Sequence, residues 1–405
     1  MKMQPADIQG NIIRPFGRPH AKYLFMQFTA EPPVVRERLH KLLNQTVTSA
    51  DLQAKLAAEW KESLKTKSSQ TAGMFGVSHA GLLKLQRTGR APLSPPLGLE
   101  YFQAGMRQQQ LPLWEPEVNR WQSEYRQERM DAFLLLCDND QSRLDKTTKA
   151  AKDQLAGFAK VMVEEEGSAI KIGDNTDDTY EPFGFRDGLS TIPDPESVFT
   201  PEPGAAGGFG CYAVFGKFAQ HVEKFGQTAK AIEAAARAKG LALTAEQAGA
   251  LAIGRQRDGT PLAPLGSDGI NDFTFKGVPA STCPFHAHIR ATNSRDGFQA
   301  FELIRRGMPY PARDGCDPGL LFLSFQRSLM DFIGMFYRAH LKFDPILTQS
   351  SQPGPFPSGG QPWPTDGEAI NYPMRDLTTL LGGEYFYIPS MIFLSNLAQG
   401  NAAAI

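Results

Sequence analysis

The chain has 405 residues, more than one hydrophobic core usually supports, so we expect two domains. Lys+Arg 42 against Asp+Glu 43 leaves a net charge of -1, which gives no support for nucleic acid or an anionic membrane as a partner. The sequence shows no secretory signal and no membrane-spanning apolar run, and its four cysteines form no CxxC pair, which speaks against a zinc site or a disulfide scaffold. We therefore expect a cytoplasmic globular protein.

The first half contains two predicted strand–helix pairs. The first is an apolar strand at residues 23–28 with a helix that begins near Pro32. The second is a strand at 131–137 with a helix that leads to a further strand at 160–163, and Ser78 suits the cap of a short helix between the pairs. Residues 91–125 show no clear pattern. The apolar positions at helical spacing are Val35, Leu39, Leu42 and Leu43 in the first long helix, and Leu144, Ala151, Leu155 and Phe158 in the second.

The second half begins after a break rich in proline and glycine between residues 193 and 208, so we predict domains 1–200 and 201–405. A strand at 210–215 and an amphipathic helix that stops near Gly240 open it, and a capping box at Thr244 begins the next helix. A strand at 320–325 and a helix at 329–340 follow, and 347–368 form a long loop. Both halves thus show a strand–helix pair near each end, which predicts an α+β fold of duplicated ferredoxin-like domains.

The stretch from Glu181 to Gly188 places one carboxylate, Asp187, among glycines and aromatic rings. Such glycines let the backbone turn tightly and approach a flat ligand, and a short aspartate among apolar neighbours suits a proton carrier. The plainer interpretation is that Asp187-Gly188 is only a turn, because Asp-Gly pairs mark turns very often.

Two further stretches carry candidate chemistry. His286 and His288 could form a metal site, a single histidine could ligate a haem, or both could be ordinary surface or core residues. Arg305 and Arg306 precede a Gly-Met-Pro turn. The pair suits a solvated strand end, but one arginine in an apolar cavity would stabilise negative charge on oxygen.

Together, these stretches resemble the dye-decolourising peroxidases. Gly184-Phe185-Arg186-Asp187-Gly188 matches the GxxDG signature of that family, and the resemblance spans residue 7 to about 390. One departure is Asn293-Ser294-Arg295, where many relatives carry proline before the arginine. The other similar landmarks, in order, are Asp7 to Ile12, Gly254 to Leu262, Ala287 to Arg290, Ile304 to Tyr310, Gly319 to Phe322 and Gly382 to Phe386.

The resemblance implies a peroxidase with one haem b per chain, bound between the halves. By the family pattern His288 would bind the iron, Asp187 would carry the proton of hydrogen peroxide, and Arg305 would stabilise the developing charge as an oxoferryl intermediate forms. Leu320 and Phe322 would wall the pocket, and Glu384 is our candidate acceptor for the second ring N–H of His288. Because aspartate titrates below histidine, we predict an acidic pH optimum.

The implied partners are hydrogen peroxide and aromatic electron donors such as dyes and phenols, with no nucleic acid and no membrane, and the sequence is compatible with a homo-oligomer. A protein that stores, senses or hands on haem, with incidental peroxidase activity, is the alternative, and a structural protein without cofactor is a third reading. A surface radical could relay electrons from a bulky dye, and the tryptophan candidates are Trp60, Trp114, Trp121 and Trp363.

Overall fold

The computed structural model covers the 405-residue chain. The residues that it describes are 3–62, 70–85, 98–108, 118–127, 129–172, 178–189, 195–202, 207–279, 281–284, 287–293, 295, 303–313, 315–340, 361–363, 370–372 and 377–398.

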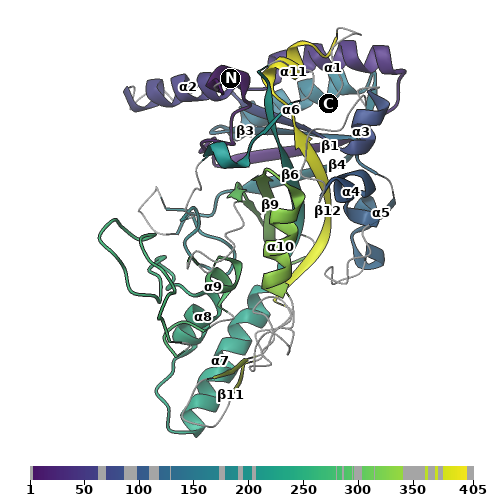
Figure 1. Ribbon diagram of the computed structural model, residues 1–405. Coiled ribbons are helices and arrows are strands. Elements are labelled where there is room, and N and C mark those ends of the chain that lie inside the picture. Colours follow the sequence, from purple (N-terminus) through teal and green to yellow (C-terminus); the bar gives the residue numbers. More distant parts are fainter. Residues whose placement is uncertain are drawn as a thin grey trace.

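The regular elements of the described residues alternate between strands and helices (Figure 1). The strands are β1 (His20–Phe28), β2 (Ala72–Val77), β3 (Ala132–Asp138), β4 (Ala159–Ser168), β5 (Thr200–Pro201), β6 (Phe209–Gln220), β7 (Ile304–Arg305), β8 (Met308–Tyr310), β9 (Gly319–Gln326), β10 (Gln361–Trp363), β11 (Ile370–Tyr372) and β12 (Thr378–Ile388). The helices are α1 (Pro32–Thr46), α2 (Ala50–Glu62), α3 (His79–Lys84), α4 (Leu99–Ala104), α5 (Ser123–Gln127), α6 (Gln141–Leu155), α7 (Val222–Ala238), α8 (Ala245–Ile253), α9 (His288–Thr292), α10 (Leu329–His340) and α11 (Met391–Ser395).

The first half forms an antiparallel sheet with the strand order β4-β1-β3-β2. Helices α1 and α6 flank this sheet, and the four apolar residues predicted for the face of α1 are its buried residues. Helix α6 begins at Asp140, whose side chain accepts a hydrogen bond from the backbone N–H of Arg143 and so satisfies one unpaired donor of the first turn. The predicted strand–helix pairs of this half are confirmed.

The second half repeats the order, as β12-β6-β9-β7, with β8 also paired to β9. Helix α10 packs on one face of these strands, where Phe332 lies 5.8 Å from Phe322, ring centroid to ring centroid. The capping box predicted at Thr244 is present at the start of α8, and the predicted limits of α10 are those of the structure.

The halves are joined through the sheet itself. Strand β12 pairs with β6 of its own half and, through Tyr387 and Val77, with β2 of the other. At the far edge β4 lies against β8, and Glu165 of β4 forms an ion pair of 2.7 Å with Lys217 of β6, so the sheet curls toward a barrel. Its largest fully buried aromatic side chains include Tyr23, Phe25, Tyr125, Phe133 and Phe215.

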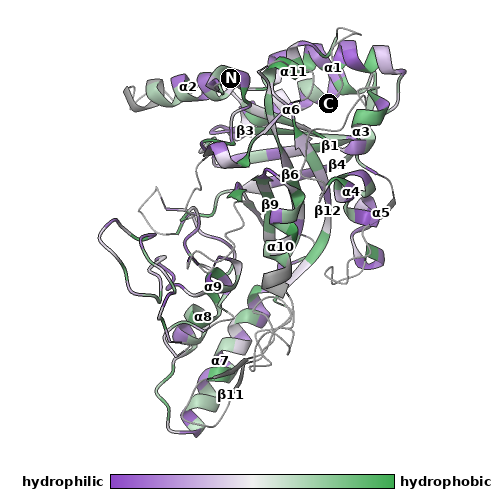
Figure 2. Ribbon diagram, viewed as in Figure 1, coloured by the Kyte–Doolittle hydropathy of each residue, from purple (hydrophilic) through white to green (hydrophobic). Residues whose placement is uncertain are grey.

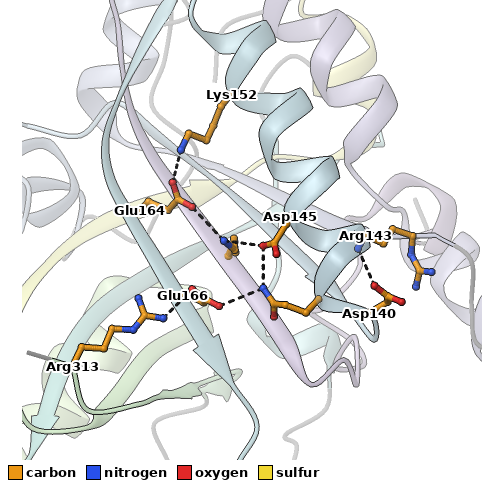
Figure 3. Close-up of polar contacts among 9 residues, drawn as sticks. Asp140, Arg143, Asp145, Lys152, Glu164, Glu166 and Arg313 are labelled. Carbon is orange, nitrogen blue, oxygen red and sulfur yellow. Dashed lines mark hydrogen bonds and ion pairs between the residues drawn. The ribbon is translucent and has the colours of Figure 1, made fainter.

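Polar contacts cover the outside of this barrel. Lys152 of α6 binds Glu164 of β4 at 2.7 Å, and Arg313 of the second half binds Glu166 of β4 at 2.9 Å, so both contacts reach the same edge strand (Figure 3). Along α7, apolar and polar residues alternate, as expected of a helix with one face toward the protein (Figure 2). No helix among the described residues is both long enough and apolar enough to cross a membrane.

The α+β class of duplicated ferredoxin-like domains is confirmed. Strand β2 and helix α2 were not predicted, and α4 and α5 lie in the stretch 91–125 that gave no pattern. Most of the predicted loop 347–368 lies outside the described residues. The boundary at residue 200 stays a prediction, because β12 links both halves in one sheet.

Candidate active site

Asp187 lies on a short hairpin made of residues 179–187. The backbone N–H of Glu181 donates to the carbonyl of Phe185 at 3.0 Å, and the N–H of Asp187 donates to the carbonyl of Thr179 at 2.8 Å. Gly184, at the turn, has φ +88°, in the left-handed region that favours glycine, so the GxxDG glycine is required by backbone geometry.

The hairpin is anchored by its aromatic residues. The ring of Phe183 stacks on Phe225 of α7 with centroids 4.8 Å apart, and Phe185 meets the same ring edge-on at 6.0 Å. The Nη1 of Arg257 donates to the carbonyl of Phe183 at 2.6 Å, and its guanidinium lies 5.0 Å from the ring of Phe185. These contacts fix the hairpin on α7 and the loop after α8.

One oxygen of the Asp187 carboxylate accepts a hydrogen bond from its own loop. Its Oδ1 accepts a hydrogen bond of 2.7 Å from the backbone N–H of Gly188, and Gly188 has φ +77°. A carboxylate has two oxygens, so Oδ2 is the one better placed to exchange a proton with a ligand.

His288 is the first residue of α9, so the histidine stretch is helical at this position and not a strand. Gly254, which ends α8 with φ +93°, makes room for α9, because a Cβ there would lie 2.5 Å from Cγ1 of Ile289. Arg290 fixes the other side by donating from Nη2 to the carbonyl of Val278 at 3.0 Å. Burial and the nearby Arg305 guanidinium lower the pKa of His288 to about 4, so its imidazole is neutral at ordinary pH, as a metal ligand must be.

Arg305 projects from β7, where it lies opposite Ser324 of β9. Directly opposed residues of antiparallel strands point to the same face, and alternate residues of one strand share a face. Arg305 therefore lies on the face of the sheet that carries Phe322 and Leu320. These two side chains are partly accessible, whereas Leu321 and Leu323 between and beyond them are buried on the barrel side.

The neighbouring Arg306 has a different environment. Its Nε and Nη2 donate to the carbonyls of Asn11 and Ile12, each at 2.8 Å. Burial lowers its pKa to about 10. The predicted arginine pair is thus divided: Arg306 ties β7 to the N-terminal segment, whereas Arg305 lies on the face of the sheet that carries Phe322 and Leu320.

Arg305 lies within electrostatic reach of both His288 and Asp187. Arg305 is solvent-accessible, yet burial lowers its pKa, and the same combination holds for the partly accessible His288. Each of the two groups is therefore close to many protein atoms while part of its surface stays accessible. The Arg305 guanidinium lowers the pKa of His288, and the Asp187 carboxylate opposes the fall in the pKa of Arg305, so the three groups are within electrostatic reach.

Sequence reasoning missed two further arginines near Arg305. Arg255 and Arg295 both lie over the ring of Phe273, at 5.1 and 3.8 Å from its centroid. Burial, together with the charges of Arg295 and Arg305, lowers the pKa of Arg255 to about 10. Guanidinium groups of like charge this close to one another favour an anionic ligand nearby. The motif 254–262 contained Arg255, but no spacing rule identifies its role.

Glu384 lies on β12, and its Oε1 accepts hydrogen bonds from the backbone N–H groups of Met106, at 2.9 Å, and Tyr385, at 2.8 Å. Burial raises its pKa. The role of Glu384 as acceptor for His288 stays a prediction, and its contacts favour instead a role in holding the turn at Met106.

The other candidates differ in what the structure describes. His286 and Trp114 lie outside the described residues, as do the side chains of Trp60 and Trp363. Trp121 is 2% exposed, so the prediction of a surface relay is wrong for this residue.

The described residues also enclose a hollow of about 530 Å³, and none of the predicted site residues lines it. In it, Nδ1 of His221 lies 2.6 Å from Oδ2 of Asp317, and Nε2 lies 2.8 Å from Oγ1 of Thr379. Its other lining residues among those described are Glu223, Lys224 and Gln227.

The fold and the pocket define a two-domain α+β barrel protein. Residues 7–169 match the family model described as the DyP dimeric alpha+beta barrel domain, and residues 181–348 match the C-terminal model of the Dyp-type peroxidases. The chain belongs to the DyP-type, or dye-decolourising, peroxidase family and is an oxidoreductase that acts on peroxide.

Known proteins support this placement. The multifunctional dye peroxidase DyP2 of Amycolatopsis sp. is 31% identical over 366 residues, which cover 73% of this chain and 77% of that protein. The crystal structure of a DyP-type peroxidase from Anabaena sp. superposes with a TM-score of 0.84 at 27% identity, covering 97% of this chain and 94% of the other. The DyP2 structure gives 0.81 at 28% identity, covering 97% and 96%.

Proposed function

We propose that this peroxidase binds one haem b per chain in the hollow between α9 and the outer face of β9, and uses it to reduce hydrogen peroxide and oxidise aromatic donors. The observation that supports the proposal is that the Arg305 guanidinium lies within electrostatic reach of both the His288 imidazole and the Asp187 carboxylate. A haem-dependent family and dye peroxidases among the relatives agree with it.

The residues present fit a haem. His288 is neutral above a pH of about 4, so its ring nitrogen can supply a lone pair to iron. Haem b also carries two carboxylates, and the guanidinium groups of Arg255 and Arg295 would offset their charge. Leu320 and Phe322 offer apolar contact to a flat macrocycle from β9.

When bound, the haem would supply an iron centre that takes electrons from the donor and gives them to peroxide. Asp187 would accept the proton from one oxygen of hydrogen peroxide on Oδ2 and return it to the other oxygen, which leaves as water. Arg305 would stabilise the negative charge on the departing oxygen, and its fixed positive charge needs no protonation change.

Because an aspartate has a reference pKa of about 3.9 and a histidine about 6.5, a carboxylate base stays ionised in mildly acidic solution. We therefore propose an acidic pH optimum for dye oxidation. A fall in rate below pH 6, with a maximum near neutrality, would count against Asp187 as the base.

The proposed donors are dyes and phenols. A structural relative, a dye-decolourising peroxidase, has been solved in complex with 2,6-dimethoxyphenol, and the name of DyP2 describes a dye peroxidase. The homo-oligomer stays a prediction, although the family description of residues 7–169 names a dimeric barrel.

Hemin titration of the purified chain tests the proposal. We expect a Soret band that saturates at one hemin per chain, followed by a spectral change and dye bleaching when hydrogen peroxide is added. Saturation without any response to peroxide would favour haem storage or transfer. No Soret band at all would leave the cavity without the proposed cofactor.

A further inference from the structure

We propose that Glu181 is a positioning residue, which holds the hairpin so that Asp187 faces Arg305 across the pocket. This inference rests on the proposed function of Asp187. The Oε1 of Glu181 accepts a hydrogen bond of 2.9 Å from the backbone N–H of Phe185, and its Oε2 accepts one of 3.0 Å from the N–H of Phe183.

Glu181 ties the turn together by its main chain as well. Its backbone N–H donates to the carbonyl of Phe185, and its carbonyl accepts from the N–H of Gly184 at 2.8 Å. Four hydrogen bonds of one residue therefore close the turn, and Asp187 follows only two residues after Phe185. A change at Glu181 would release amide donors in a packed setting, where an unpaired polar group is costly.

The same carboxylate connects the hairpin to the sheet that carries Arg305. Nε2 of Gln220, the last residue of β6, donates to Oε2 of Glu181 at 2.6 Å. Strand β6 pairs with β9, and β9 pairs with β7, on which Arg305 lies. Asp187 and Arg305 are thus linked by one continuous set of hydrogen bonds, in which Glu181 connects the hairpin to the sheet.

The carboxyl group of Glu181 changes its protonation state near neutral pH. Burial and, to a smaller extent, the negative charge of Asp187 raise the pKa of Glu181 to about 7, against the hydrogen bonds that favour its ionised form. Among the described residues, Oε1 of Gln220 is buried and has no hydrogen-bond partner. If the amide of Gln220 turned by half a rotation, this oxygen would accept a hydrogen bond from the O–H of a neutral Glu181. The charged or titratable groups on the surrounding elements are Arg186 and Asp187 of the hairpin, Arg257, Glu246 of α8, and His221 with Asp317 beside β6.

Two consequences follow for the pocket. In acidic solution Glu181 is neutral, so no second negative charge opposes the one that builds on peroxide. Above neutral pH its charge is added beside Asp187. Gln220 offers a partner in both states, so the hairpin stays closed while the charge changes.

The first experiment measures the hairpin itself, by amide hydrogen exchange in the full chain loaded with hemin. We expect exchange in peptides covering residues 179–189 to rise about tenfold in Glu181→Ala, the ratio expected from losing about one hydrogen bond to a charged group. Glu233→Gln, which removes a surface carboxylate from α7, should exchange as the wild type does. Unchanged exchange in Glu181→Ala would overturn the positioning role, whether or not the chain reacts with peroxide.

The second experiment measures the second-order rate of the Soret change with hydrogen peroxide from pH 4 to pH 9. Glu181→Gln copies the neutral form, so we expect rates within about twofold of wild type below pH 6 and a several-fold faster reaction than wild type above pH 8. A ratio of the two rates that stays constant across this range would overturn the charge effect. A wild type that does not react at any pH would refute the proposed function, while the exchange measurement still decides the role of Glu181 in the hairpin.

Discussion

The two halves of the molecule share a strand order but differ in where they carry chemistry. In the first half, the connection from β1 to β2 spans residues 29–71 and carries α1 and α2. The apolar face of α1 is buried. In the second half the chain from β6 to β7 spans residues 221–303 and carries α7, α8 and α9. The comparison teaches that the duplicated sheet supplies a frame, and the longer connection of one copy supplies His288 and Arg255.

The largest expected effect concerns that connection. His288→Ala should abolish stable hemin binding, seen as loss of the Soret band after gel filtration, because no other ring nitrogen is proposed as iron ligand. His40→Ala is the matched change on α1 of the first half, where Nδ1 lies 2.9 Å from the carbonyl of Leu394. It should bind hemin as the wild type does. Equal hemin binding by both variants would contradict the assignment of His288.

The next effect separates binding from chemistry. Asp187→Asn and Arg305→Leu should keep hemin but react with hydrogen peroxide about 10² to 10⁴ times more slowly, the range expected for loss of a general acid–base or of charge stabilisation. Stopped-flow absorbance would measure this rate. A variant with a wild-type rate would remove that residue from the mechanism, while normal hemin binding would still support the pocket.

Changes in the sheet of the first half, away from Asp187, should alter stability and not chemistry. Phe133 is fully buried in the barrel, 4.8 Å from Phe386 of β12, ring centroid to ring centroid. Phe133→Ala should lower the free energy of unfolding by about 3–5 kcal/mol, as expected for a large aromatic cavity. Denaturant unfolding would measure the loss. The folded fraction should still react with peroxide at the wild-type rate.

Two buried carboxylates should give the halves opposite pH dependence. Burial alone would raise the pKa of Asp138, but hydrogen bonds from Arg143 and Thr71 hold it below its ordinary value. Its contribution to stability is therefore present above pH 4 and lost below it, so Asp138→Asn should cost about 1–2 kcal/mol at pH 7 and less at pH 3.

Glu202 should show the opposite dependence of stability on pH, because burial raises its pKa to about 7 despite the hydrogen bonds from Ser390. Stability linked to Glu202 is present below pH 4.5 and is lost as the pH rises to 7. Glu202→Gln should therefore gain roughly 2 kcal/mol relative to wild type between pH 4.5 and pH 8. Thermal melts from pH 3 to pH 8 would measure both carboxylates, and parallel curves for wild type and variant would contradict either assignment.

The smallest expected effect is at the surface. Glu164 binds Lys152 at 2.7 Å in Figure 3, but both side chains are substantially exposed, so solvent screens the pair. Glu164→Gln should change the free energy of unfolding by about 0.5 kcal/mol or less. A change above 1 kcal/mol would indicate that this edge contributes more to barrel closure than the surface pair suggests.

Periodicity and caps predicted the regular parts well. The apolar spacing of α1, the capping box of α8 and the limits of α10 could be read directly, because each is set by local chemistry. Strand β2 was missed because Ala72–Val77 contains two glycines and is buried on both faces, which removes any alternation.

The site was less accessible to such reasoning. The motif resemblance supplied Asp187, His288 and Arg305, since loops and a two-residue strand have no period. Arg255 is placed by tertiary packing on Phe273, and Glu181 by a turn that its own carboxylate closes. Neither Arg255 nor Glu181 shows a regular spacing in the sequence. The position of Glu181 just before a Pro-Phe-Gly turn could have suggested its role.

Strand β12 occupies the centre of the sheet although it comes after the other strands of that sheet in the chain. While the protein is being made on a ribosome, β2 and β6 therefore keep open edges until residues 378–388 emerge. Open strand edges can pair with other chains, so the nascent protein is exposed to misassembly at this stage. Completion of the barrel therefore waits for residues 378–388, and a chain cut short before residue 378 would leave the edges of β2 and β6 unpaired.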